Sequence, residues 1–266
     1  MSAIDLLFQQ LRIAGRKAFM PFVTAGDPDL SFTSDVLQTL AECGCDMCEL
    51  GIPYSDPIAD GPVIQASFTR ALAGGVSLDA IFRQLQPLAQ TSSMPLVTMV
   101  SFSIIHRQGL DAYVARAQAA GFAGAIVPDL LVEEAPPLAS VCRKRDFSLI
   151  QLVTPTTPHE RAKRIADSST GFLYYVSVTG ITGERTALPA EVVANVGRLR
   201  EHTQLPICIG FGISTPEHVR LLAPVADGLI VGSAIVRRVA EASVRARSEV
   251  LRDVRQYVSE LIGALR

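Results

Sequence analysis

Lysine is scarce in this chain, which has only three lysines among its 266 residues. Lys17 and Lys144 precede predicted strands, and Lys163 lies within a predicted helix. An imine-forming lysine of a parallel α/β protein belongs at the carboxyl end of a strand, where active sites of such proteins lie. The sequence therefore predicts chemistry without a Schiff base.

Metal-binding patterns are missing as well. The four histidines stand far apart, without the spacing of metal ligands. The five cysteines are scattered, and Cys45 and Cys48 match C-x-x-C by letter only. They have no second pair, and they run from a helix end into a strand, whereas redox pairs open helices. We expect buried thiols and no metal site.

Long apolar runs and a strong net charge are also absent. No run approaches the ~20 residues of a membrane span, and the net charge of −2 argues against nucleic-acid or anionic membrane surfaces. The N-terminal stretch lacks a basic region and a long apolar core, so it predicts a first amphipathic helix and no signal peptide. We expect a cytoplasmic protein.

What the chain does contain is an alternation of apolar strand-like runs and helix-like runs. The hydrophobic content of 48% allows a large core, and the length is close to the ~250 residues of one (β/α)8 barrel. The runs show no polar alternation, as in buried parallel strands. We predict eight strands: Ala18–Thr24, Met47–Gly51, Leu96–Ser101, Gly124–Pro128, Ser148–Val153, Leu173–Val178, Ile207–Gly210 and Gly228–Val231. A closed TIM barrel with an additional N-terminal helix is favoured over a doubly wound sheet, and no linker divides the single domain 1–266.

Helix boundaries are indicated by local chemistry. Thr157 and Glu160 are spaced as a capping box with a proline between them, and Thr215 with Pro216 repeats the Thr-Pro start. The last helix places apolar residues on one face, among them Val250.

The most informative segment runs from Cys48 to Pro62. Glu49 ends a short strand, and a Gly- and Pro-rich loop with Asp56 and Asp60 follows. A carboxylate at the carboxyl end of a buried strand is costly unless it has a function. Two carboxylates in different surroundings can divide acid and base work. The alternative is that Glu49 is a capping residue and that Asp56 and Asp60 are ordinary turn residues. For Asp56, which precedes Pro57, the two interpretations are equally favoured.

Glycines gather after the last strands. Gly210 and Gly212 follow the seventh strand, and Gly232 with Ser233 follows the eighth and opens a helix. Such loops let backbone N–H groups approach an anion, and they form the usual phosphate site of this fold. A third loop, 179–183, is expected to close over the substrate. Tight turns or a plain linker remain the alternatives.

These motifs together resemble the α subunit family of tryptophan synthase. The matching segments are Pro21-Phe-Val-Thr-Ala-Gly-Asp-Pro28, Glu49-Leu-Gly-Ile-Pro-Tyr-Ser-Asp-Pro-Ile-Ala-Asp-Gly-Pro-Val-Ile-Gln65, Val178-Thr-Gly-Ile-Thr-Gly183, Gly210-Phe-Gly-Ile-Ser214 and Gly232-Ser-Ala-Ile235. The resemblance implies retro-aldol cleavage of indole-3-glycerol phosphate to indole and glyceraldehyde 3-phosphate. Glu49 would then be the general acid–base, and Asp60 would accept the indole N–H.

The resemblance also implies the remaining site residues. The phosphate would be held by Gly183, Gly212, Gly232 and Ser233. The indole pocket would be lined by Phe22, Ile64 and Tyr174, although composition alone favours core roles for each. Thr182 would contact the loop that bears Asp60.

A partner is implied in the same way. Family members bind a pyridoxal-phosphate (PLP) β subunit, expected as an α2β2 complex, and Pro53 and Asp56 would lie on the contact surface. The cofactor would belong to the partner and none to this chain.

Two segments depart from the family pattern: Ser101-Phe-Ser-Ile104 replaces a Tyr-x-Asn-Pro type sequence, and Leu131-Val132 replaces a Pro-Pro pair. They put the pocket detail and the partner affinity in question. Two alternatives therefore stay open, namely a stand-alone lyase and a weakly catalytic regulatory subunit.

Overall fold

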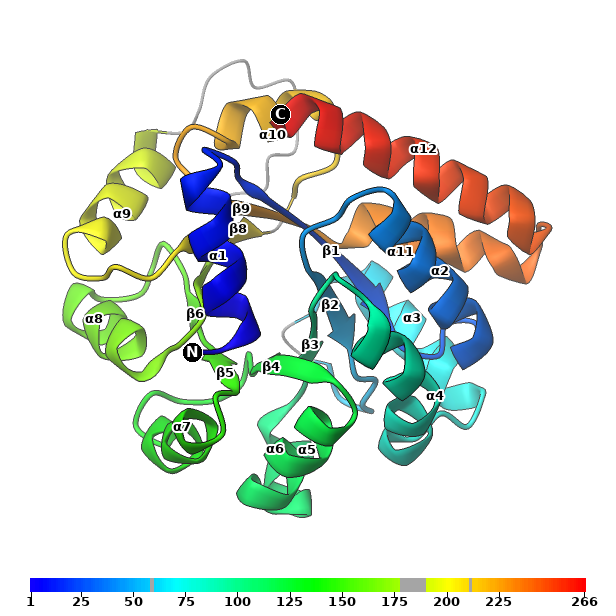
Figure 1. Ribbon diagram of the computed structural model, residues 1–266, viewed down its shortest axis with the longest axis horizontal. Helices are drawn as coiled ribbons and strands as arrows, with labels where there is room; N and C mark the ends of the chain where they lie inside the picture. Colours follow the sequence, from blue (N-terminus) through cyan, green and yellow to red (C-terminus); the bar gives the residue numbers. More distant parts are fainter. Residues whose placement is uncertain (58–59, 178–189, 211) are drawn as a thin grey trace.

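The computed structural model describes residues 1–57, 60–177, 190–210 and 212–266 of the chain. Its strands form one parallel sheet in the order β5-β4-β3-β2-β1-β9-β8-β7-β6. The strands are β1 Ala18–Thr24, β2 Cys48–Gly51, β3 Leu96–Met99, β4 Phe122–Ile126, β5 Ser148–Ile150, β6 Leu152–Val153, β7 Leu173–Val176, β8 Ile207–Gly210 and β9 Gly228–Val231. Helices surround this sheet on its outer side (Figure 1).

The sheet closes on itself through the predicted strand 148–153. That strand is divided at Gln151 into β5, which pairs with β4, and β6, which pairs with β7. The two end strands of this order, β5 and β6, are therefore joined by one residue of chain. The predicted TIM barrel is confirmed, and its fifth strand serves as two short pieces.

The helices follow the strands in the order expected of βα units. They are α1 Ala3–Ile13, α2 Leu30–Glu42, α3 Pro62–Ala73, α4 Leu78–Thr91, α5 Phe102–Gln108, α6 Leu110–Ala119, α7 Ala135–Lys144, α8 His159–Ser168, α9 Ala190–Arg200, α10 Pro216–Leu222, α11 Ser233–Ala240 and α12 Arg247–Leu265, with a 3-10 turn at Glu241–Ser243. The last helix, α12, packs on α2, α10 and α11 (Figure 1). Its buried face contains Val250, Val254, Val258 and Leu261, as predicted.

The additional N-terminal helix covers one end of the barrel. Ile4, Phe8 and Leu11 of α1 pack with residues that point into the barrel, such as Met20 and Ile150. Ser2 caps the helix in a capping box with Asp5. Because the strands begin at this end, the opposite end is the one left for a site.

Several predicted boundaries were wrong, and those at Thr157 and Ser101 have local reasons. The predicted capping box at Thr157 does not form, because the Thr157 hydroxyl accepts a bond from the Thr154 N–H and α8 begins after Pro158 without a side-chain cap. Ser101 is not a strand residue but the N-cap of α5, where it accepts from the Ser103 N–H. The fourth strand begins at Phe122, before the predicted Gly124. The start at Thr215 is confirmed, since its side chain accepts from the His218 N–H.

None of the helices in the described ranges is long and apolar enough to cross a membrane.

Candidate active site

Glu49 points into the barrel near the carboxyl end of β2. Its neighbours Cys48 and Leu50 belong to the outer core between sheet and helices, whereas Met47 belongs to the barrel interior. Alternation along a strand therefore places Glu49 on the inner side. Across the sheet it is in register with Phe22 on β1 and Val97 on β3.

The Glu49 carboxyl group is fully buried and unpaired. Its side chain is 0% exposed, and neither oxygen has a hydrogen-bond partner among the described residues. Burial raises the pKa of Glu49 well above its ordinary value of 4.5, because an apolar site disfavours the charged form. Burial without a partner therefore favours the protonated form of this group.

Asp60 supplies the second carboxyl group, from the loop between β2 and α3. It is half-buried, and burial raises the pKa of Asp60 to about 6. Glu49 and Asp60 both raise the pKa of Tyr174 electrostatically, after the larger effect of its burial, so both carboxyl groups lie within electrostatic range of that hydroxyl. The fold thus brings together the two carboxyl groups predicted from the sequence, in surroundings that raise the pKa of each.

Two aromatic rings fill the space beside these carboxyl groups, and a glycine makes room for each. A Cβ atom added to Gly51 would lie 2.4 Å from the Phe22 ring, and one added to Gly210 would lie 2.2 Å from the Tyr174 hydroxyl. Both rings are buried, at 4% and 3% exposure. Phe22 packs with Ile64 of α3 in one apolar cluster. Two of the predicted pocket residues, Phe22 and Ile64, therefore lie together, and Tyr174 lies against Gly210 of β8.

The sequence patterns did not predict that Gly51 and Gly210 make room for aromatic rings. A glycine inside a buried strand signals close approach of another group, and this signal was available at both positions. It does not say which side chain approaches, since Phe22 and Tyr174 are brought there by strand register.

Of the predicted phosphate residues, Gly232 lies next to Phe22, and Ser233 follows it in the chain. Gly232 caps α11, and a Cβ atom added to it would lie 3.6 Å from Phe22. Ser233 begins α11, so its N–H is among the helix groups without an intrahelical acceptor. Gly212 has φ +77, a left-handed conformation that favours glycine. Gly183 and Thr182 lie outside the described residues.

The predicted partner-contact residues differ in exposure. Pro53 is buried within the chain, while Asp56 is exposed and accepts a 2.6 Å bond from the Ser55 hydroxyl. The role of both residues at a partner surface stays a prediction.

The atypical segment after β3 satisfies its own polar groups. Asp129, at the end of β4, accepts 2.7 Å bonds from the Ser101 hydroxyl and from the Phe102 N–H. The Ser101 hydroxyl also lies 2.7 Å from that of Ser103. This network ties β3 to β4 at the active end. Beside it, Leu131 is 53% exposed, so its apolar side chain faces solvent in this chain.

The described ranges also bear on the requirements of a metal site and on the C-x-x-C pattern of Cys45 and Cys48. No group of three or more His, Cys, Asp or Glu side chains there could hold a metal ion. Cys45 and Cys48 are free, buried thiols whose pKa values are raised by burial.

Comparison with known proteins identifies the family to which the chain is similar. Residues 8–265 match the family model described as tryptophan synthase alpha chain. A tryptophan synthase alpha chain from Rhodopirellula baltica is 60% identical over 251 residues, which are 93% of this chain and 90% of that protein. The crystal structure of tryptophan synthase subunit alpha from Legionella pneumophila has a TM-score of 0.90 at 34% identity, covering 100% of this chain and 98% of that one. A chain of the tryptophan synthase complex from Pyrococcus furiosus gives 0.83 at 36% identity, covering 93% and 99%.

Proposed function

This chain belongs to the tryptophan synthase α chain family, and from that premise we propose how its residues perform the family's reaction. The protein is a lyase of tryptophan biosynthesis that cleaves indole-3-glycerol phosphate. The products in our proposal are indole and glyceraldehyde 3-phosphate. The observation that carries the proposal is the fully buried, unpaired carboxyl group of Glu49.

In this proposal Glu49 donates one proton and then accepts another. The bond that breaks joins C3 of the indole ring to a glycerol carbon that carries a hydroxyl group. Protonated Glu49 first gives its proton to C3, and the positive charge that results spreads to the ring nitrogen. The carboxylate then takes the hydroxyl proton while the carbon–carbon bond breaks, so that an aldehyde forms and the bonding electrons return to the ring. Glu49 ends in its starting state.

Asp60 accepts the ring N–H in the same proposal. A carboxylate close to the nitrogen stabilises the positive charge that develops there in the transition state. This requires the ionised form, which Asp60 adopts above a pKa of about 6. The different surroundings of the two carboxyl groups thus suit different tasks. The ring itself accepts the electrons, which is why the scarcity of lysine is no obstacle.

The substrate is bound at both ends. Phe22, Ile64 and Tyr174 supply the apolar walls for the indole ring. We assign the phosphate to Gly212, Gly232 and Ser233, together with Gly183, and we assign Thr182 to the contact with the Asp60 loop. The N–H groups at the start of α11 favour an anion there.

The proposed partner is a PLP-dependent β subunit in an α2β2 complex. Membership of the family implies a β partner, and the related Pyrococcus furiosus chain comes from a structure of a tryptophan synthase complex. We place Pro53 and Asp56 at the contact and assign the PLP cofactor to the partner.

The test is release of indole from indole-3-glycerol phosphate by the purified chain, with and without a β subunit. Wild-type release together with its loss in Glu49→Gln supports the proposal, provided that the variant still binds glycerol phosphate. Strong stimulation by the β subunit indicates an ordinary α subunit, and fast release that ignores the partner indicates a stand-alone lyase. Unchanged turnover in Glu49→Gln would remove Glu49 from the mechanism.

A further inference from the structure

Helix α3 begins directly after the loop that bears Asp60, with Gly61 as its N-cap. The placement of this helix therefore influences the placement of Asp60. Two polar contacts fix α3 to β1 and the following loop. The Thr24 hydroxyl lies 2.6 Å from the Ser67 hydroxyl, and Arg70 donates bonds of 2.9 and 2.7 Å to the two oxygens of Asp27.

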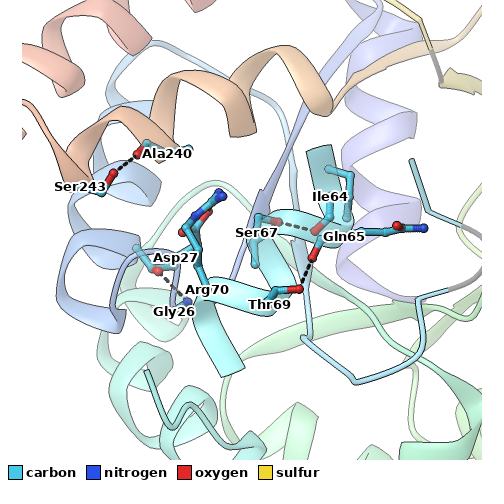
Figure 2. Close-up of polar contacts among 11 residues, drawn as sticks. Gly26, Asp27, Ile64, Gln65, Ser67, Thr69, Arg70, Ala240 and Ser243 are labelled. Atoms are coloured by element: carbon cyan, nitrogen blue, oxygen red, sulfur yellow. Dashed lines mark hydrogen bonds and ion pairs between the residues drawn. The ribbon is translucent and has the colours of Figure 1, made fainter. Parts of the chain in front are cut away.

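Each contact includes a side chain that the fold has buried. Asp27 is 0% exposed and Ser67 is also fully buried. Ser67 donates its own proton to the Ile64 carbonyl at 2.7 Å, so Thr24 is the donor in the other bond. Figure 2 shows Arg70 against Asp27, with Ser67, Ile64 and Gln65 further along the same helix. The helix is thus a fixed support for whatever its first turns hold.

Gln65 holds the Asp60 loop against this support. Its side-chain Nε2 donates to the Asp60 carbonyl at 2.8 Å and to the Pro57 carbonyl at 3.2 Å. The Asp60 N–H also donates to the Pro57 carbonyl, at 3.1 Å. The amide therefore holds the main chain at both Pro57 and Asp60.

We propose that Gln65 is a positioning residue for Asp60, which fixes its main chain so that the carboxylate faces the indole nitrogen. This proposal rests on the assigned role of Asp60 and adds a residue that no substrate group touches. An amide of this length supplies two N–H donors to two carbonyl oxygens. Asparagine is one methylene shorter, and glutamate offers only acceptors when ionised.

The test compares Gln65→Met with wild type. Methionine keeps the length and removes both donors, and it is tolerated because Gln65 is exposed. We expect kcat to fall about tenfold, the effect of roughly one net hydrogen bond, with little change in KM, because Asp60 acts mainly in the transition state. Thr69→Ala is the matched control: its hydroxyl donates to the Gln65 carbonyl at 3.0 Å, on the same helix but away from the loop. Its kinetics should equal those of wild type.

The pH dependence of kcat/KM separates positioning from general support of the fold. Release of the loop exposes Asp60 to water and so lowers its pKa. The fall of kcat/KM on the acid side of the pH profile, here called the acid limb, should therefore move to lower pH in Gln65→Met. Gln65→Glu adds a carboxylate beside the loop and should move that limb to higher pH. Limbs that stay in place in both variants would overturn the proposal.

A double-mutant cycle separates this proposal from the role of Asp60 itself. In an Asp60→Asn background, Gln65→Met should cause no further loss, because the group it positions is already altered. Full additivity of the two losses would refute positioning while leaving Asp60 in place. Wild-type turnover in Asp60→Asn alone would instead refute the proposed role of Asp60.

Discussion

Replacement of Glu49 by glutamine should stabilise the protein progressively as pH rises. The carboxyl group is buried without a partner, and its pKa is raised well above 4.5 by that burial. Above pH 4.5 the unfolded chain releases this proton, while the folded chain keeps it. Folding therefore becomes less favourable with rising pH until the raised pKa is reached. Glutamine has the same shape and no proton to keep.

The magnitude follows from proton linkage. For each pH unit in this window, wild type loses about 1.4 kcal/mol of stability through Glu49. The stability difference between Glu49→Gln and wild type should therefore grow by about 1.4 kcal/mol from about pH 5.5 to 6.5. The buried amide has its own cost, but that cost is independent of pH. Asp60 contributes equally to both proteins and cancels in the difference.

Urea unfolding followed by far-UV circular dichroism measures this difference, since the chain has no tryptophan for fluorescence. Glu201→Gln is the control, because Glu201 is an exposed carboxylate after α9. Its stability curve should stay parallel to that of wild type. A Glu49→Gln curve that is also parallel to wild type would mean that Glu49 is ionised in the folded protein, and the proton assigned to C3 of indole would be lost from the mechanism.

Four further outcomes are expected. In wild type, kcat/KM should fall below pH about 6 as Asp60 becomes protonated, and Asp60→Asn should lower kcat and abolish this limb; an unchanged limb in the variant would assign it to another group. Gly51→Ala should raise KM, because its Cβ would lie 2.4 Å from the Phe22 ring, and Gly51→Ala/Phe22→Leu should recover part of the loss; equal KM values in wild type and Gly51→Ala would exclude a tight pocket there. Gly212→Asp should weaken glycerol phosphate binding in calorimetry more than Gly212→Ala, since it adds a carboxylate to the strain at φ +77; equal affinities would leave strain as the only effect. Addition of a β subunit should raise indole release, and a rate independent of the partner would indicate a stand-alone lyase.

Much of the barrel could be predicted because its strands are locally marked. Parallel strands buried on both faces read as continuous apolar runs, and β1 and β9 were predicted with their observed bounds. The errors fall where a side chain had two local choices. Ser101 ends an apolar run but caps α5, and Thr157 is spaced for a cap but bonds back to Thr154. The sequence pattern does not decide which of the two local structures forms at either residue.

The candidate site likewise contains residues that the sequence predicted and residues that it did not. Glu49 and Asp60 were found because carboxyl groups beside a buried strand are costly and therefore conspicuous. Gln65 lies within the quoted motif and carried no role, since its task depends on two carbonyl groups brought to it by the loop. The pocket glycines were likewise ambiguous until the strand register placed Phe22 and Tyr174 against them.

The sequence by itself determined the barrel, the two carboxyl groups and the glycine loops, because each depends on residue type and spacing along the chain. The tertiary structure decided the protonation of Glu49, the shape of the pocket and the attachment of the Asp60 loop to α3. Those properties arise from neighbours that are distant in sequence. A carboxyl group's pKa depends on how completely other elements exclude water from it, and no local pattern contains that information.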